Sequence, residues 1–355
     1  MKALVLGATG HIGAHVVRAL LANGCDVRAA YRNPRYLHVL DGLAVERLPV
    51  DLDDRQAIRR AVDGCDRIFH CAGYYPRFTD RRGPAVEQGI AQIRRIFDVL
   101  RDARAARIVY TSSAATIAPR PDRLSTEEDR EPWSPHLLHP PKADLRWWRR
   151  PSGQQQVGGW PPTTWRSLYA TVKIAMERAV DDYVRDGLPV VITHPSLCIG
   201  AYDAHPFSGR LVLLFAKGRL PVYLEHRFNV VYTGDVGIGH AAAAEGGRAG
   251  AHYLLATQQT SVSEFARVVA QEAGVTPPRW ALPYSAAMAA AAGTELVAAV
   301  TGREPLLTRG IVRMTRQGQR VDGSKAQREL GVPATPMAEA IRRSLAWFRA
   351  HGYLR

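Results

Sequence analysis

Hydrophobic residues alternate between two patterns through the first half of the chain. A short continuous apolar run at Ala3 to Leu6 predicts a strand buried on both faces, and the stretch from His11 to Leu21 carries apolar residues at helical spacing. Further strands are predicted at residues 26–30, 45–49, 67–71, 107–110 and 189–193, mostly with helices between them. Strand and helix in regular alternation predict an α/β fold with a doubly wound parallel sheet.

The final third of the chain shows mainly helical spacing. Helices are predicted near 207–217, 261–273, 284–300, 305–315 and 336–351, and short strands at 228–232 and 252–255. We therefore expect a sheet domain over residues 1–196, to which residues 228–258 return. Residues 197–227 and 259–355 would form a smaller, mostly helical C-terminal lobe that binds the substrate.

The segment 132–166 interrupts this pattern. It holds five of the seven tryptophans and seven prolines, so a long helix is not expected there. A structureless loop of this length is uncommon unless it is a lid, a binding element or disordered. Three interpretations stay open: a lid over the site, a mobile surface loop, or a contact between the subunits of a homodimer. Residues 147–150 could stack on nucleic acid, but no other basic and aromatic motif stands out, so no nucleic-acid partner is expected.

Three glycines, Gly7, Gly10 and Gly13, come directly after the first strand. In this context the first allows a tight turn, the second lets the backbone approach a pyrophosphate, and the third lets the helix sit close to the strand. The helix N-terminus then offers free N–H groups and a positive dipole end to phosphate. A glycine triplet between a strand and a helix predicts dinucleotide binding by a Rossmann-type domain.

The end of the second strand indicates which dinucleotide is bound. NAD enzymes usually place a carboxylate there to bind the ribose 2′-hydroxyl. Here the turn reads Ala29-Ala30-Tyr31-Arg32 and has no carboxylate. Arg32 can pair with a 2′-phosphate instead, so we predict NADP(H) as the cofactor.

Residues suited to acid–base chemistry occur after the fifth strand and in a later helix. Tyr169 and Lys173 are four residues apart, which places a phenol and an ammonium on one helix face. The ammonium favours the phenolate, so the phenol can act as a general acid or base. Thr111-Ser112-Ser113 ends the fifth strand at the carboxyl edge of the sheet, where a serine hydroxyl can hold the oxygen of a carbonyl or alcohol.

The composition limits the function classes. The 355 residues carry a formal net charge of +14, which would attract anions, although arginines spread over solvated faces are the simpler explanation. The four cysteines have no metal-ligand spacing, so we expect no metal and a cytoplasmic location. Strand-forming residues begin at Lys2 and no stretch suits a bilayer span, so neither a signal peptide nor a membrane span is expected.

Taken together, these motifs resemble those of the extended short-chain dehydrogenase/reductases of the NAD-dependent epimerase/dehydratase family. The matching positions are the glycine turn, Ser113, Tyr169 and Lys173. Residues 27–34 and 109–116 resemble the dihydroflavonol-reductase-like branch. Residues 301–305 and 346–354 resemble bacterial members labelled hopanoid-associated sugar epimerases, and the similarity covers nearly the whole chain except 132–166.

The resemblance implies a role for each matched residue. Tyr169 would be the proton donor, Lys173 would also bind the nicotinamide ribose, and Ser113 would orient the substrate oxygen. Asp51 and Leu52 would flank the adenine. The remaining implied cofactor contacts are Gly7, Thr9, Gly10, His11, Ile12, Gly13, Cys71, Ala72, Gly73 and Thr111, with Pro195 and Ser196 near the nicotinamide.

Two positions depart from the pattern of this family. Val86 stands where many relatives carry an asparagine that anchors a water relay. His194 replaces the asparagine of an Asn-Pro-Ser motif. It is either a substrate contact or a core residue bonded to the backbone, and we favour the second.

The predicted function is reduction of a carbonyl, or oxidation of a secondary alcohol, in a small-molecule substrate by hydride transfer with NADP(H). One alternative is a nucleotide-sugar epimerase or dehydratase that retains its cofactor. Another is a non-catalytic NADPH-sensing protein, against which the intact Ser113, Tyr169 and Lys173 argue, since a sensor does not need them.

Overall fold

The structure is a computed structural model that describes residues 1–77, 80–134, 137, 167–218, 220–301, 305, 307–310, 312, 315 and 318–354. Nearly all of the segment 132–166 therefore lies outside the described residues, and the three interpretations given for it stay predictions. The same holds for much of the helix predicted at 305–315.

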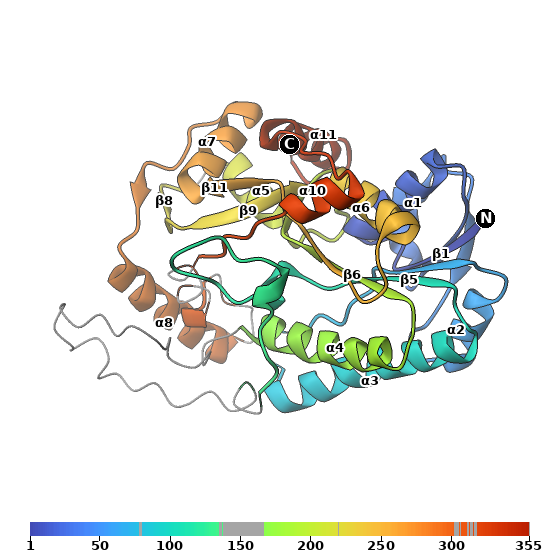
Figure 1. Ribbon diagram of the computed structural model, residues 1–355. Helices are drawn as coiled ribbons and strands as arrows, with labels where there is room; N and C mark the ends of the chain where they lie inside the picture. The colour runs from blue at the N-terminus through green and yellow to red at the C-terminus, as the bar shows by residue number, and fades with distance from the viewer. Residues whose placement is uncertain are drawn as a thin grey trace.

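A seven-stranded sheet forms the centre of the molecule (Figure 1), with strand order β10-β6-β5-β4-β1-β2-β3. Every neighbouring pair in it is parallel. Its strands, in chain order, are β1 (Lys2–Leu6), β2 (Asp26–Tyr31), β3 (Glu46–Pro49), β4 (Arg67–His70), β5 (Arg107–Thr111), β6 (Val190–Pro195) and β10 (His252–Leu255). The order reverses between β1 and β4, as in a doubly wound sheet, and this confirms the predicted fold class.

Helices cover both faces of this sheet. The helices α1 (His11–Ala22) and α6 (Thr233–Gly246) pack together, and α3 (Arg82–Asp102) packs against α4 (Leu168–Arg185) beside α2 (Arg55–Val62). In β1, Val5 belongs to the core that contains α1 and α6, whereas Leu4 belongs to the core that contains α2, α3 and α4. Successive side chains of a strand point to opposite faces, so a continuous apolar run fits a sheet covered on both sides.

The C-terminal part is mostly helical, as predicted, but it also contains a small sheet. Strands β7 (Leu197–Ile199), β9 (Arg227–Tyr232) and β11 (Gln258–Ser261) form it, and β8 (Val222–Tyr223) pairs with β12 (Trp280–Ala281). The helices there are α5 (Gly209–Ala216), α7 (Val262–Ala273), α8 (Tyr284–Thr301), α10 (Ser324–Leu330) and α11 (Met337–Ala350), as Figure 1 shows. One core cluster runs from the main sheet into this part, for example from Val5 to Phe265 and Phe348.

The carboxyl ends of four central strands lie along one edge of the main sheet. The glycine turn follows β1, Cys71 follows β4, Ser112 follows β5, and Ser196 follows β6. Parallel sheets bind ligands at this edge because it is where the connecting loops meet. Over the described residues, no helix is both long and apolar enough to cross a membrane.

Candidate active site

The glycine turn between β1 and α1 is packed too tightly for larger residues. Gly7 has φ +82°, and a Cβ on it would lie 2.9 Å from the backbone nitrogen of Ala72. A Cβ on Gly13 would lie 2.1 Å from the Gly7 carbonyl oxygen. Gly10 is exposed and caps α1. Because it has no side chain, the N–H groups at the helix N-terminus stay accessible to an anion.

His11, the first residue of α1, turns away from solvent. Its Nε2 lies 2.9 Å from the Thr233 hydroxyl of α6, and its Nδ1 lies 3.8 Å from an Asp203 carboxylate oxygen. Burial lowers the pKa of His11 to about 3, so the ring is neutral at physiological pH. His11 therefore ties the glycine turn to the C-terminal part, and a cofactor would meet its backbone.

Ser113 and Tyr169 lie together although 56 positions separate them in the chain. Ser113 follows β5, where its hydroxyl accepts a hydrogen bond of 3.2 Å from the Ala115 N–H. Tyr169 lies in the first turn of α4. Burial raises the pKa of the Tyr169 phenol, while hydrogen bonding by the Ser113 and Tyr75 hydroxyls acts in the opposite direction.

Lys173 is a buried cation one turn further along α4. Its side chain is 2 % exposed, and among the described residues no hydrogen bond or ion pair reaches its ammonium. Burial lowers the pKa of Lys173 to about 8, although the Glu177 carboxylate favours the charged form. A Cβ at position 73 would lie 2.7 Å from the Lys173 nitrogen, so glycine leaves the space in which the ammonium lies.

The ends of β5 and β6 add further groups to the same edge. The Ser196 hydroxyl is buried and has no hydrogen-bond partner among the described residues. The Thr111 hydroxyl, in contrast, already lies 2.8 Å from Nε2 of His240. Burial raises the pKa of the Cys71 thiol to about 12, which keeps it neutral. A hydroxyl and an ammonium that lack hydrogen-bond partners in the described part of the chain suit the hydroxyl and amide groups of a nicotinamide nucleoside.

The remaining predicted cofactor contacts lie at the ends of β2 and β3. Arg32 is exposed, and its side chain has no partner among the described residues. Asp51 is exposed too, and its carboxylate accepts a 3.0 Å hydrogen bond from the Asp53 N–H. Leu52 packs against the core on the α2 and α3 side of the sheet.

Two aromatic residues that the sequence analysis missed surround Tyr169. The Tyr75 ring stacks on the Tyr169 ring at a centroid distance of 5.3 Å, and the Phe207 ring lies 6.0 Å from it. Tyr75 is 51 % and Phe207 65 % exposed. The position of Tyr75 after the end of β4 could have indicated a site residue, whereas Phe207 comes from a loop with no such signal.

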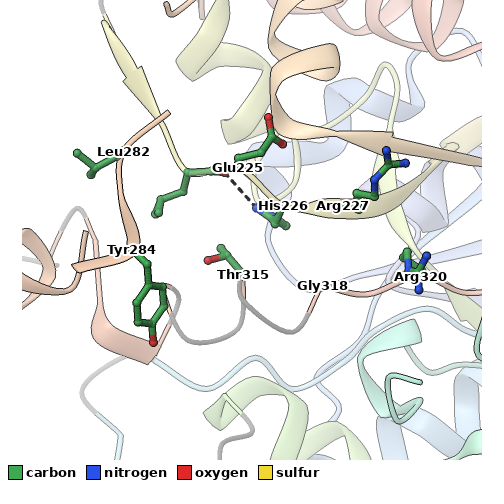
Figure 2. A pocket seen from close by; sticks show the side chains of 9 residues that line it. Glu225, His226, Arg227, Leu282, Tyr284, Thr315, Gly318 and Arg320 are labelled. Atoms are coloured by element: carbon green, nitrogen blue, oxygen red, sulfur yellow. Dashed lines mark hydrogen bonds between the residues drawn. The ribbon is translucent and has the colours of Figure 1, made fainter. Parts of the chain in front are cut away.

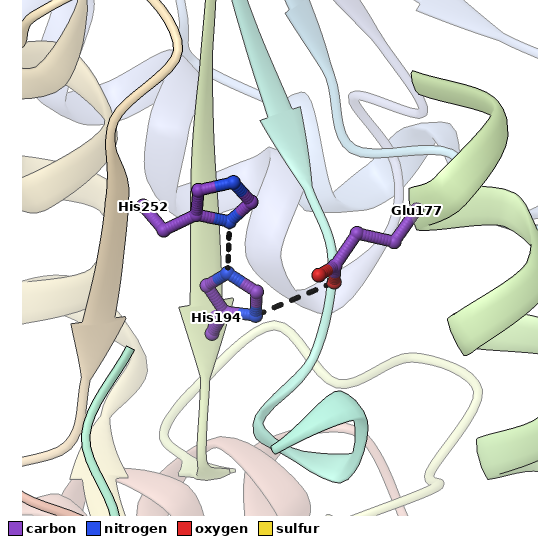
Figure 3. Close-up of side chains that lie close together, drawn as sticks. All are labelled: Glu177, His194 and His252. Atoms are coloured by element: carbon purple, nitrogen blue, oxygen red, sulfur yellow. Dashed lines mark hydrogen bonds and ion pairs between the residues drawn. The ribbon is translucent and has the colours of Figure 1, made fainter. Parts of the chain in front are cut away.

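His194 belongs to a buried polar cluster next to Ser113 (Figure 3). Its Nδ1 lies 3.3 Å from the Ser113 carbonyl oxygen and 3.5 Å from Glu177, and its Nε2 lies 2.9 Å from His252. His194 is fully buried and both of its ring nitrogens contact protein groups, one of them a backbone carbonyl, as in the core residue that we favoured.

Glu177, His194 and His252 are of the types that bind metals, and one ligand atom from each lies within 4.8 Å of the others. However, the two nitrogens of His194 face different partners, and the Arg130 guanidinium lies 3.4 Å from Glu177. The Ser112 hydroxyl also donates a hydrogen bond to Glu177. The cluster thus links the turn that carries Ser113 to α4, which carries Tyr169 and Lys173.

A pocket of about 570 Å³ lies in the C-terminal part (Figure 2), lined by Leu224, Glu225, His226, Arg227, Leu282, Tyr284, Thr315, Gly318 and Arg320. The side chain of Gln319, between two lining residues, donates a hydrogen bond to the Ala114 carbonyl. The pocket therefore lies next to the Ser113 turn, and it offers a ligand both apolar and cationic side chains.

Val86 leaves no polar group at its position in α3. It is 2 % exposed and packs in the core beside α4. One turn later, a Cβ on Gly89 would lie 3.0 Å from Val172, which shows how closely α3 and α4 approach.

The fold and the strand-edge site define a Rossmann-type protein of the extended short-chain dehydrogenase/reductase class. The family model described as "NAD dependent epimerase/dehydratase family" matches residues 3–139. The chain is 30 % identical to sterol demethylase protein B of Methylococcus capsulatus, with 100 % of both chains covered. It belongs to the NAD-dependent epimerase/dehydratase family.

Other relatives carry reductase and epimerase names. The chain is 27 % identical to a putative dihydroflavonol 4-reductase of Synechocystis, over 99 % of this chain and 95 % of that protein. Among solved structures, a nucleoside-diphosphate-sugar epimerase from Pseudomonas aeruginosa matches with a TM-score of 0.76 and 26 % identity, over 100 % of this chain and 99 % of that one.

Proposed function

We propose that this protein uses NADPH to reduce a carbonyl group, with Ser113, Tyr169 and Lys173 as the residues of the reaction. The observation that carries the proposal is the buried Lys173 ammonium one turn from Tyr169, which no hydrogen bond or ion pair from the described residues reaches. A buried charge of this kind costs stability and is kept where a ligand completes its environment. The relatives named as reductases support the reaction type.

Ser113, Tyr169 and Lys173 have separate roles in the proposed reaction. When bound, the cofactor would provide the hydride for the carbonyl carbon. The Ser113 hydroxyl orients the carbonyl oxygen, and the Tyr169 phenol gives that oxygen its proton. Lys173 binds the ribose hydroxyls next to the nicotinamide and stabilises the phenolate that Tyr169 becomes. Neutral Cys71 and the unpartnered Ser196 hydroxyl line the same edge.

Arg32 supports NADP(H) over NAD(H). It is exposed at the end of β2, its side chain is unpaired among the described residues, and no carboxylate precedes it in the turn. A guanidinium there binds a 2′-phosphate through paired hydrogen bonds. Residues 1–196 with 228–258 would bind the cofactor, and residues 197–227 and 259–355 the substrate. The four free thiols support a reducing compartment such as the cytoplasm.

The test is a turnover screen with NADPH and NADH over ketones, aldehydes and sugar nucleotides. We expect loss of NADPH absorbance in proportion to product, and a Tyr169→Phe variant that binds NADPH normally but turns over about 100-fold more slowly. Arg32→Ala should lose most of the preference for NADPH. Equal affinity of the parent protein for the two cofactors would contradict the assignment of NADP(H).

A second candidate is a nucleotide-sugar epimerase that retains its cofactor. Arg227 and Arg320 in the pocket would suit a diphosphate, and one similar structure is named a nucleoside-diphosphate-sugar epimerase. The same screen separates the two functions. Interconversion of sugar-nucleotide epimers with no change in absorbance, by a protein purified with bound nicotinamide, would favour the epimerase.

A further inference from the structure

The phenols of Tyr75 and Tyr169 lie together at the N-terminal end of α4. Tyr75 lies five residues beyond the end of β4, and its ring stacks on Tyr169 at 5.3 Å with an interplanar angle of 19°. The Phe207 ring contacts both phenols, at 5.5 Å from Tyr75 and 6.0 Å from Tyr169. The Lys173 ammonium lies 5.6 Å from the centre of the Tyr75 ring. Tyr75 therefore touches both residues of the Tyr-Lys pair.

The two stacked phenols affect each other's ionisation, and the effect differs in the two directions. Ionisation of Tyr169 is the largest cause that raises the pKa of Tyr75 well above its ordinary value. Hydrogen bonding by Tyr75 in turn lowers the pKa of Tyr169. Tyr75 thus keeps its proton when Tyr169 loses its own, and it acts as the donor.

Other titratable groups face Tyr169 from the elements packed around it. Lys173 lies one turn along the same helix, and Cys198 of β7 and Tyr110 of β5 also interact electrostatically with this pair of phenols. Burial raises the pKa of Cys198 to about 12 and that of Tyr110 well above its ordinary value, so both stay neutral. In the described part of the chain, the Ser113 and Tyr75 hydroxyls are therefore the groups whose hydrogen bonding lowers the pKa of Tyr169.

We propose that Tyr75 is a positioning residue of the reduction, and that its hydroxyl donates a hydrogen bond to the Tyr169 oxygen while that oxygen loses its proton. This inference rests on the proposed function. In the step, the O–H bond of Tyr169 breaks and an O–H bond forms on the product alcohol, while the hydride comes from NADPH. Tyr75 loses no proton, so its contribution ends when solvent restores the proton of Tyr169.

The variant Tyr75→Phe removes the hydroxyl and keeps the stacked ring. A hydrogen bond to a charged oxygen is worth enough to shift the titration of Tyr169 by about one pH unit. In the direction of reduction, activity falls where Tyr169 is deprotonated, so the basic limb of the kcat profile should move up by about one pH unit in the variant. Turnover below that limb should fall about tenfold because the phenol becomes a weaker acid.

The neighbouring tyrosine provides the matched control. The Tyr74 hydroxyl lies 3.2 Å from an Asp80 carboxylate and not at Tyr169. The Tyr74→Phe variant should keep the parent pH profile, and both variants should keep the parent affinity for NADPH. A Tyr75→Phe enzyme whose basic limb stays at the parent position would overturn the inference, even if its turnover were lower.

A measurement without turnover separates this inference from the proposed function. In protein labelled with ¹³C at the tyrosine ζ carbon, the Tyr169 signal is the one lost in Tyr169→Phe. Its titration midpoint should rise in Tyr75→Phe and stay unchanged in Tyr74→Phe. A parent protein that reduces no carbonyl defeats the proposed function, whereas an unmoved midpoint in Tyr75→Phe defeats the role of Tyr75.

Discussion

Lys173 shows at the scale of one residue how a site can reduce the stability of its own fold. The ammonium is 2 % exposed, and burial lowers its pKa to about 8. An unfolded lysine keeps its proton up to about pH 10.4, so between that pH and 8 the unfolded chain binds more protons than the folded one. The free energy of unfolding of the parent should therefore rise with pH over this interval. At pH 7, burial of the charged ammonium lowers that free energy by its full amount.

The Lys173→Met variant replaces this cation by an apolar side chain of similar length. We expect the free energy of unfolding at pH 7 to increase by on the order of 2 kcal/mol, and its rise between pH 8 and 10 to disappear. The affinity for NADPH should fall in the same variant because the ribose contact is lost. Urea unfolding at pH 7 and pH 9.5 measures the first effect, with the exposed Lys217→Met as control. A variant less stable than the parent at pH 7 would mean that Lys173 has a partner in solution.

At the scale of an element, the turn between β1 and α1 is packed so closely that one added methyl group should disturb it. A Cβ at Gly13 would lie 2.1 Å from the Gly7 carbonyl oxygen, and backbone cannot move aside as a flexible side chain can. The Gly13→Ala variant should therefore push α1 away from β1, cost about 1–3 kcal/mol of stability, and weaken NADPH binding. Thermal unfolding and cofactor titration test this.

Gly83, in α3, provides the control for that substitution. Among the described residues, apart from the adjoining residues and the backbone of its own helix, no heavy atom lies within 4 Å of its ideal Cβ position, so Gly83→Ala should preserve both stability and binding. If Gly13→Ala binds NADPH as tightly as the Gly83 variant, the turn does not hold the pyrophosphate.

Most elements that could be predicted from the sequence have either a continuous apolar run or apolar residues at helical spacing. All seven strands of the main sheet were predicted, as were α1, α3 and α4. The helix α6 was missed because its sequence, rich in alanine and glycine, has no polar stripe, and β7 and β11 are too short to show a period. Ser113 was placed correctly at a strand end, whereas Tyr75 and Phe207 depend on loop conformations that only tertiary contacts determine.

At the scale of the whole molecule, buried histidines make the stability sensitive to acid. Burial is the largest cause that lowers their pKa values, to about 4 for His240, about 2 for His252, and about 3 for His11, His15 and His70. Unfolding exposes each ring, and it then takes up a proton below about pH 6.5. The stability that these neutral rings contribute is therefore full above about pH 6.5 and is lost as the pH falls toward the folded values.

His70 is the histidine whose replacement tests this account most cleanly. His70 is fully buried, with 0 % solvent exposure, and neither ring nitrogen has a hydrogen-bond partner among the described residues. The His70→Leu variant should be about 1–3 kcal/mol more stable at pH 7, because a buried unsatisfied polar group is removed. Its free energy of unfolding should also fall less steeply below pH 6.5, by up to about 1.4 kcal/mol per pH unit, since one proton fewer is taken up. Denaturant unfolding from pH 7 to pH 4.5 measures both effects, with the exposed His205→Gln as control. Equal slopes for the His70 variant and the parent would show that other groups cause the loss of stability in acid.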